Sequence, residues 1–475
     1  MNARVKFVLV VVIAMLVVGA FLRVPPRAMG LVGDGKADDT TALRKAITAG
    51  GSVVLPRGVY RITETITVEL DRVGFTSLVG DGTARIVMAG KGPALHLIGT
   101  HGGTADPTSV KAEVFDRQRM PVVRGIEIVG DHAEADGIEA SGTMQLTVAE
   151  VMVRQCRHAI HLTRRNRNLI VSNCHLYHNR GVGIYYDDVN LHQSNIVGCH
   201  VSYCAGGGVV IRGGEVRNVH IGTCDIESNM TPDGPPTANV LIDCTGGSTD
   251  EVAITGCTLQ HNSKSAGSAN IRVVGKGITS ARNPTPTQEG HIAITGNVFS
   301  DVKVNIHLQN ARGVSIVGNT FWEGFEHDLL IEDSVAVVVG ANDFDRNPRY
   351  TVNGQWGKDQ GGLTFKNCAD CKLSGFLVKG VWVRPVAVSM AACDRCTVTD
   401  VSILDCDGIG LRLQDCTRCR VSECEIRDDR EGEARKATKS IVVAGGKENR
   451  LRGNAFGNGA EIDKDAAQVE GNWTK

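Results

Sequence analysis

A phrase of six residues recurs along this chain at a nearly constant interval. It consists of an apolar residue, any residue, a small or polar residue, Cys or Asn, any residue and a second apolar residue, as in Val171–Leu176, Ile196–Val201 and Ile294–Phe299. Fourteen copies, weaker ones included, lie mostly 22 to 25 residues apart between Ile126 and Asn472. A unit of this length cannot bury its apolar face alone, so neighbouring units must stack into one continuous core.

A second apolar strand recurs between the phrases, as in Ala159–Leu162, Asn270–Val273 and Asn305–Leu308. Each unit is therefore predicted to hold about three short strands and no helix. Parallel stacking at roughly 4.8 Å per coil gives a rod of about 65 Å for about fourteen coils. The Cys or Asn position then becomes an internal column at a turn, where Asn amides bond to neighbouring coils and Cys serves as a small apolar side chain.

The first part of the chain carries a further signature. Residues 33–46 read Gly-Asp-Gly-Lys-Ala-Asp-Asp-Thr-Thr-Ala-Leu-Arg-Lys-Ala, and residues 50–60 read Gly-Gly-Ser-Val-Val-Leu-Pro-Arg-Gly-Val-Tyr. This segment resembles the opening of the rhamnogalacturonase and epimerase-like pectate lyase domain. With the repeat, it makes the chain similar, from about Gly30 to Trp473, to the right-handed parallel β-helix of the pectate-lyase-like superfamily.

The predicted fold is therefore all-β, a right-handed parallel β-helix solenoid of about fourteen coils with a short N-terminal capping helix. Asp38 to Thr40 are expected to cap this helix, which runs to about Ala49 and covers the open end of the first coil. Val53 to Leu55 form the first strand. Residues 30–120, with the cap helix and first coils, are expected to form one continuous domain with the repeats of 121–475.

The first 22 residues are typical of an export signal. Arg4 and Lys6 precede the uncharged run Phe7–Leu22, which is short for a membrane span and ends near Gly19-Ala20. An uncleaved signal anchor is the alternative reading, and it would be the chain's one contact with a membrane. Either way the remaining chain is predicted to be exported, as a periplasmic, cell-surface or secreted protein.

Charge and cysteine content exclude some functions. With 51 basic and 52 acidic residues, the net charge of -1 gives no field that would hold nucleic acid.

The fifteen cysteines all lie between Cys156 and Cys424. Three Cys-x-x-Cys pairs suit a zinc site or a redox pair, but the second cysteine of each pair falls in the column of apolar residues that includes Val219, Val252 and Ile292. The cysteines are therefore interpreted as core residues, with disulfides between coils as the alternative. The pairs are Cys368/Cys371, Cys393/Cys396 and Cys416/Cys419.

The resemblance implies that the active cleft lies over the second strand of each coil. Polar residues just before or pointing outward from this strand become the catalytic candidates: Asp136, Glu139, His158, His161, Tyr185 and Asp187. Glu139, His161 and Tyr185 share one register and should form a row with a spacing of about 5 Å. Arg164 and Arg165, on the adjoining turn, would bind a substrate carboxylate. Such a set can move a proton and neutralise a uronic acid.

This sequence lacks most of the catalytic motifs on which the known mechanisms of the superfamily depend. Asp136-Gly137-Ile138 is similar to the first catalytic motif of polygalacturonase-type hydrolases, but Arg157-His158 replaces their following Asp-Asp pair. Their Gly-His-Gly and Arg-Ile-Lys motifs are absent, as is the Arg-x-Pro-x-x-Arg of calcium-dependent pectate lyases. The sequence predicts no metal ligands and identifies no certain cofactor, with calcium as the alternative.

Insertions at residues 229–238, 262–269, 345–361 and 428–439 share one phase of the coil and should wall a groove beside the second strand. Four residues of one insertion are predicted to bind substrate through basic groups and exposed rings: Arg346, Arg349, Tyr350 and Trp356.

A competing row of candidate site residues lies on another face of the predicted rod. It consists of His175, His200 and Asp225, with Tyr177, Ser202 and Glu227 two residues later.

The sequence thus predicts an exported protein whose partner is an acidic polysaccharide. It is expected to be a lyase or glycoside hydrolase acting on a uronic-acid-containing glycan, and a monomer. A non-catalytic glycan-binding or cell-surface rod is the alternative. A homotrimeric spike is disfavoured because the sequence shows no coiled-coil or C-terminal trimerisation segment.

Overall fold

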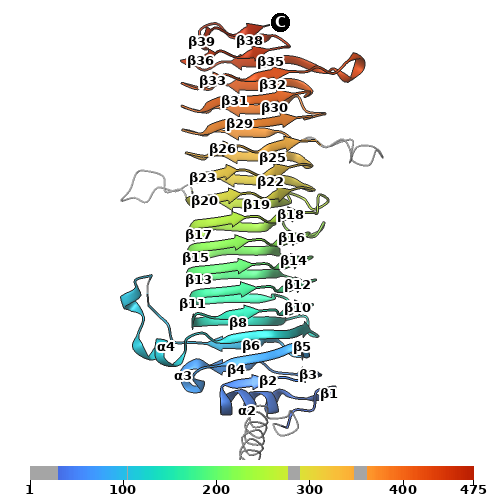
Figure 1. Cartoon of the computed structure of the whole chain (residues 1–475), viewed down its shortest axis with the longest axis vertical. Helices are drawn as coiled ribbons and strands as arrows, with labels where there is room; N and C mark the ends of the chain where they lie inside the picture. The colour runs from blue at the N-terminus through green and yellow to red at the C-terminus, as the bar shows by residue number, and fades with distance from the viewer. Residues whose placement is uncertain (1–29, 104, 277–288, 347–360, 475) are drawn as a thin grey trace, which may run out of the picture.

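The computed structural model describes residues 30–103, 105–276, 289–346 and 361–474 of the 475-residue chain. They form one long rod in which coil lies on coil (Figure 1). Strands pair in parallel with the strands of the next coil, as β13 (Val182–Val197) pairs with β11 (Ile160–Ser172) and β15 (Gly207–Gly222). The rod is the predicted right-handed parallel β-helix.

Most strands are short, and a few longer ones bend from one face of the rod to the next. The first third holds β1 (Asp34–Asp38), β2 (Ser52–Val54), β3 (Gly58–Ile62), β4 (Ile66–Glu69), β5 (Ser77–Met88), β6 (Gly92–Ile98), β7 (Val122–Gly130), β8 (Ala135–Met144), β9 (Thr147–Ala149) and β10 (Met152–Arg154). The middle also holds β12 (His175–Tyr177), β14 (His200–Ser202), β16 (Asp225–Glu227), β17 (Ala238–Thr255), β18 (Thr258–Gln260), β19 (Ala269–Val274), β20 (Glu289–Thr295), β21 (Val298–Phe299), β22 (Val302–Gln309), β23 (Ala311–Val317), β24 (Thr320–Phe321) and β25 (Gly324–Glu332). The last third holds β26 (Val338–Gly340), β27 (Asp343–Asp345), β28 (Leu363–Lys366), β29 (Lys372–Lys379), β30 (Val386–Ala391), β31 (Thr397–Leu404), β32 (Gly408–Gln414), β33 (Arg420–Ser422), β34 (Glu425–Arg427), β35 (Ala437–Ala444), β36 (Asn449–Arg452), β37 (Ala455–Phe456), β38 (Ala460–Ile462), β39 (Ala467–Glu470) and β40 (Trp473–Thr474).

One column of residues runs through the full height of the rod, with one residue in each coil. Its sixteen members are Val53, Leu78, Val123, Val148, Val171, Ile196, Ile221, Ile254, Ile294, Ile316, Val339, Leu373, Val398, Val421, Leu451 and Val469. The rod therefore has two more rungs than the sequence repeat indicated. The additional rungs, at Val53 and Leu78, precede the first recognisable phrase.

The Cys and Asn positions of the repeat form the predicted internal column. Asn297 donates through Nδ2 to Oδ1 of Asn319 at 3.1 Å, and Asn319 donates in the same way to Asn342 at 3.0 Å. Asn319 is 1% exposed, and Cys174, one of the cysteines at the same position in other coils, is fully buried. All fifteen cysteines are buried free thiols, so the interpretation as core residues holds and no disulfide joins the coils.

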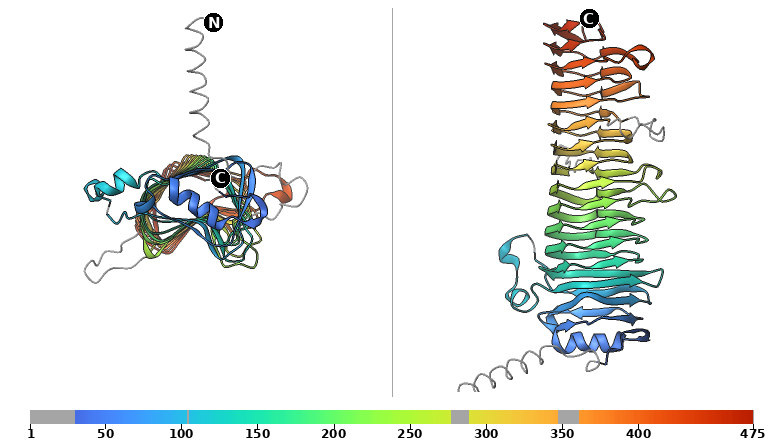
Figure 2. Two further views of the ribbon diagram at one scale, coloured as in Figure 1. Left: turned by 90° about the horizontal axis from the view of Figure 1, so that it is seen from below. Right: turned by 45° about the vertical axis from the view of Figure 1, so that its right-hand side comes forward.

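Helix α2 (Thr40–Gly50) covers the N-terminal end of the cylinder, as predicted, and lies across the coil when the rod is seen from below (Figure 2). Leu43 and Ile47 of this helix are buried against the first coils. The cap differs in detail: the Asp39 carboxylate accepts from the backbone N–H groups of Val32 and Gly33, while Asp38 accepts from Thr40 N–H.

Two further short helices, α3 (Leu70–Val73) and α4 (Ala112–Arg117), leave the strand pattern, and α4 stands on an arm beside the rod (Figure 2). Among the described residues, no helix combines the length and the apolar character needed to cross a membrane. The expected signal at residues 1–22 lies outside the described part of the chain.

In the middle of the rod, apolar residues that point outward from the second strand are buried. Val210 and Leu241 point outward from this strand but are 1% and 4% exposed. They pack in a small apolar cluster with Ala238 and Ala269, the residues at which the chain re-enters the coil after the insertions of 229–238 and 262–269. The outer surface next to β13 is therefore closed on one side by apolar contacts between neighbouring coils.

Candidate functional site

Near the N-terminal end of the rod, polar side chains on the second strands of successive coils form a row. Backbone pairing places Glu139 of β8 beside His161 of β11, and His161 beside Tyr185 of β13, so these predicted residues share one register. His96 of β6 pairs with Glu139 and extends the row by one coil. We call these four residues the second-strand row.

His96 was missed because it precedes the first recognisable phrase of the repeat. Its signal is the alternation in Leu95-His96-Leu97, where the two leucines are buried and the imidazole points outward. His96 Nε2 lies 3.4 Å from Glu139 Oε1 and 3.4 Å from Ser141 Oγ. Burial lowers the pKa of His96, and the opposing effect of the Glu139 carboxylate does not overcome it.

Three rings of the site form a compact group. His161 and Tyr185 stack, with centroids 5.3 Å apart and planes 6° from parallel. The ring of His158, on the turn before β11, lies 5.2 Å from His161 and 5.1 Å from Tyr185. The structure therefore brings together three of the predicted residues from two neighbouring coils.

His158 is held as a neutral imidazole. Its Nδ1 accepts a hydrogen bond from the Val182 backbone N–H at 3.1 Å. Burial lowers the pKa of His158 to about 4, although the nearby Asp136 carboxylate acts in the opposite direction. The ring therefore carries its proton on Nε2 near neutral pH and can donate a hydrogen bond there.

His161 and Asp187 form a pair beside the Tyr185 ring. His161 Nε2 lies 2.9 Å from Asp187 Oδ2, whereas His161 Nδ1 is buried and lacks a hydrogen-bond partner in the described structure. The Asp187 side chain is 40% exposed, so its carboxylate is the end of the pair that solvent reaches. Burial and the neighbouring Asp187 raise the pKa of Tyr185, and its hydroxyl stays protonated. The group offers a carboxylate that can accept a proton and a phenol that can donate one.

Asp136, a predicted catalytic residue, is 1% exposed. Its carboxylate accepts hydrogen bonds from Arg157 Nε and Nη2, at 2.9 and 2.5 Å, and from the backbone N–H of His158 at 2.9 Å. A carboxylate paired in this way holds the turn between β10 and β11. In this structure Asp136 therefore positions His158, and it has no open path to a substrate.

Arg212 is the arginine next to Tyr185 and Asp187. It occupies the same register as Asp187 in the following coil, interacts with the Tyr185 hydroxyl, and lies 3.3 Å from Asp243. Arg212 could have been predicted from the repeat, because it occupies in the next coil the position that Asp187 occupies in its own.

Two of the arginines predicted to bind substrate, Arg164 and Arg165, precede Tyr185 in the chain. Arg164 is exposed on a bend with φ of 59° and acts electrostatically on His96, at the N-terminal end of the row. Arg165 lies toward Arg167 and His101, where it lowers the pKa of that histidine together with burial.

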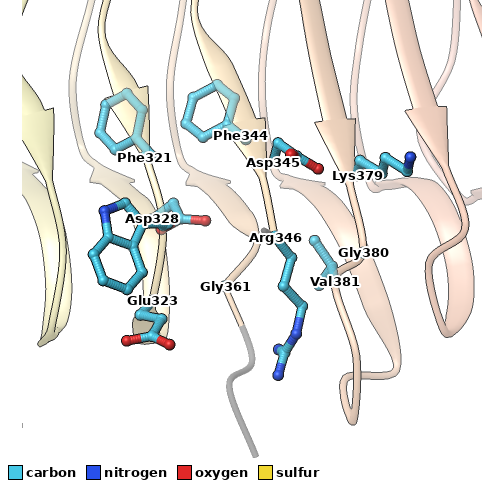
Figure 3. A pocket seen from close by; sticks show the side chains of 11 residues that line it. Phe321, Glu323, Asp328, Phe344, Asp345, Arg346, Gly361, Lys379, Gly380 and Val381 are labelled. Carbon is cyan, nitrogen blue, oxygen red and sulfur yellow. The ribbon is translucent and has the colours of Figure 1, made fainter. Parts of the chain in front are cut away.

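Arg346 lies in a separate pocket, on the turn before the second strand that is six rungs beyond Tyr185. Glu323 and Asp328 are on one side of this pocket and Arg346 on the other (Figure 3). The Arg346 guanidinium stacks on Trp382, 4.3 Å from the ring centre. The other three predicted loop positions, Arg349, Tyr350 and Trp356, lie outside the described residues.

The competing row is also present on its own face of the rod. His175, His200 and Asp225 are in register on β12, β14 and β16. Tyr177 OH lies 3.0 Å from His200 Nδ1, and the rings of His175 and His200 are 5.1 Å apart. This group is as closely packed as the second-strand row but faces another direction.

Three family models match successive parts of the chain. Residues 24–123 match "Rhamnogalacturonase A/epimerase, pectate lyase-like", residues 114–262 match "Right handed beta helix region", and residues 245–475 match "Periplasmic copper-binding protein (NosD)". A comparison with curated proteins finds no significant match.

Solved structures to which this chain is similar include tailspike protein 3 of bacteriophage CBA120, at 14% identity and a TM-score of 0.44, with 94% of this chain and 61% of the tailspike covered. The A-module of a mannuronan C-5 epimerase from Azotobacter vinelandii gives 15% identity and a TM-score of 0.34, covering 95% of this chain and 98% of the module. A surface adhesin of Streptococcus pneumoniae gives 14% identity and a TM-score of 0.43, covering 92% and 91%.

The residues that the structure describes do not fit a copper site. In the described part of the chain, no group of three or more His, Cys, Asp or Glu side chains is arranged to hold a metal ion. The cysteines of the region that matches the copper-binding family, such as Cys368 and Cys393, are 1% exposed within the core. His307 and Glu332, 3.2 Å apart, supply only a pair of ligands.

Proposed function

Because the chain is a right-handed parallel β-helix protein of the pectate-lyase-like superfamily, we propose that it acts on a polysaccharide. We place its active site at the second-strand row, around His161 and Tyr185 and the side chains next to them. The observation that carries this proposal is the grouping of His158, His161, Tyr185 and Asp187 beside Arg212 on the outer surface of two neighbouring coils. A proton donor, a proton acceptor and a cation thus converge at one place on a rigid scaffold.

The arrangement suits β-elimination from a uronic-acid-containing chain. The Arg212 guanidinium would pair with the uronate carboxylate and stabilise the negative charge that develops next to it. The carboxylate of Asp187, held by His161, would take the C5 proton. The C5 electrons then form the C4–C5 double bond while the C4–O bond breaks, and Tyr185 would supply a proton to the departing oxygen.

The proposal also places the protein outside the cytoplasm. The charged start and uncharged run of residues 1–22 support export, as does the similarity of residues 245–475 to a family described as periplasmic. An acidic glycan as the partner is supported by Arg212, Arg164 and Arg165 on or near the same face.

The test is a panel of purified polyuronides, including polygalacturonate, alginate and a non-sulfated glycosaminoglycan. Each reaction is followed both by ultraviolet absorbance of new unsaturated ends and by an assay of new reducing ends. Elimination predicts that both signals rise together with one substrate. Reducing ends without absorbance would indicate hydrolysis, and silence in both with retained glycan binding would make the rod a non-catalytic binding protein.

A further inference from the structure

A cluster of exposed rings lies at the end of β12 and β14, away from the second-strand row. His178 and Tyr203 stack with centroids 4.9 Å apart and planes 12° from parallel. Tyr177 lies 6.4 Å from each of them, and His175 joins Tyr177 at 5.8 Å. Tyr203 is 45% exposed and His178 is also exposed. We call His175, Tyr177, His178, His200 and Tyr203 the aromatic platform.

The rings occupy backbone positions that do not favour them. His178 and Tyr203 follow their strands at the same turn of successive coils, with φ of 51° and 59°. This left-handed conformation suits Gly and Asn, and a bulky side chain there costs conformational energy. Ser228 fills the same turn in the next coil, so the fold itself does not require a ring.

Two carboxylates border the platform in the next coil. Glu227 accepts from Tyr203 OH at 2.9 Å and from Gln260 Nε2 at 3.0 Å. Asp225 Oδ1 is buried and has no hydrogen-bond partner among the described residues. No Lys or Arg of the described chain forms an ion pair with either carboxylate. The nearby His261 lies between two acids, with Nε2 3.9 Å from Glu227 Oε2 and Nδ1 3.3 Å from Asp301 Oδ2.

We propose that the aromatic platform and the Glu227–Asp225 pair form a second glycan-binding site, which takes a sugar bearing a free amine. An exposed Tyr ring offers an apolar face for a sugar ring and a hydroxyl at its edge. Asp225, Glu227 and Asp301 surround the single imidazole of His261, and this excess of carboxylates attracts an ammonium group. Aromatic faces add to that attraction. The same carboxylates disfavour a uronate, so the platform selects an amino-sugar segment and the second-strand row an acidic one. This site does not depend on the proposed elimination.

The test measures binding of a glucosamine oligosaccharide by titration calorimetry at mildly acidic pH, with the N-acetylated oligomer of equal length as the comparison ligand. The glucosamine oligomer should bind saturably, and the N-acetylated oligomer should bind at least fivefold more weakly. Tyr203→Ala and Glu227→Gln should each weaken binding of the glucosamine oligomer about tenfold. Phe115→Ala and Glu113→Gln, which change exposed residues of α4, should leave it unaltered.

The proposal is overturned if the glucosamine oligomer does not bind, or if it binds equally well to the Tyr203→Ala and Glu227→Gln proteins. Equal affinity for the N-acetylated oligomer would overturn the assignment to an amino sugar. Unaltered circular dichroism of each variant ensures that a loss of binding reports the site. Because Tyr203 and Tyr185 lie on different faces, a failure here leaves the elimination chemistry untouched, and a failure of that chemistry leaves this site untouched.

Discussion

At the scale of single residues, the inner column of Asn side chains joins the coils by hydrogen bonds that no other residue type completes. Asn319 donates to the Ile294 carbonyl and to Asn342, and its own Oδ1 accepts from the backbone and side chain of Asn297. Every polar atom of this buried amide is therefore used, and its removal strands partners in two coils.

We predict that Asn319→Ala lowers the free energy of unfolding by about 2–4 kcal/mol, because it leaves buried N–H and C=O groups without partners. Asn319→Cys is the matched control, since other coils carry Cys at this position, where Cys257 accepts from the backbone of Cys224. The Asn319→Cys protein should lose less free energy of unfolding than the Asn319→Ala protein. Urea unfolding of the three proteins measures both effects, and an equal loss for Ala and Cys would contradict the account.

His158 predicts a dependence of stability on pH. Burial lowers its pKa in the folded protein to about 4, below the roughly 6.5 of an unfolded chain. The stability that it contributes is therefore complete above pH 6.5 and is lost as the pH falls toward 4, by about 2–3 kcal/mol. His158→Gln should flatten this loss in urea unfolding at pH 7.5 and 4.5, and His291→Gln, at an exposed position, should not. A loss of the same size in the His158→Gln protein would refute this reading.

At the same scale, some site residues could be predicted from the sequence and others could not. Glu139, His161 and Tyr185 were found because the period of the repeat fixes which residues share a register. The role of Asp136 could not be found, since its burial depends on Arg157 folding back from the next coil. Arg212 was not predicted, because it lies one coil beyond Tyr185 and Asp187, where the predicted site ended.

At the scale of elements, α2 is the cover of an otherwise open cylinder. A solenoid coil contacts only its neighbours, so the terminal coil depends on its cap. Leu43 and Ile47 fill the end of the core at 0% and 2% exposure. The sequence predicted this helix and its length, because the apolar spacing and the turn residues around it are local signals.

We predict that Leu43→Ala destabilises the N-terminal coils by about 2–5 kcal/mol through the cavity that it leaves. Hydrogen exchange should accelerate in β2 to β6 and remain unchanged in β31 to β39, because the loss is local in a repeat protein. Lys45→Ala on the exposed side of the same helix is the control. Acceleration along the whole rod would contradict this view of the cap.

At the scale of the whole molecule, the sixteen rungs set a rod of about 70 Å. The sequence predicted its architecture because one phrase per coil is repeated, but the insertions carry no such period. Val210 and Leu241 are packed in an apolar cluster on the outer face of the second strand, beside which the insertions were expected to wall a groove. The rod therefore presents at least two separate polar faces, one with the second-strand row and one with the aromatic platform.

The central claim is that Tyr185 donates the proton in a reaction at the second-strand row. The most direct measurement is kcat on the polyuronide that gives the largest ultraviolet signal, for Tyr185→Phe against Tyr60→Phe. Both changes remove one hydroxyl, and Tyr60 is a buried residue of β3 whose hydroxyl bonds to the Pro56 carbonyl. We predict a loss of about 100-fold or more in kcat for Tyr185→Phe, the size expected for removal of a general acid, and little change for Tyr60→Phe. Full activity of the Tyr185→Phe protein would contradict the claim.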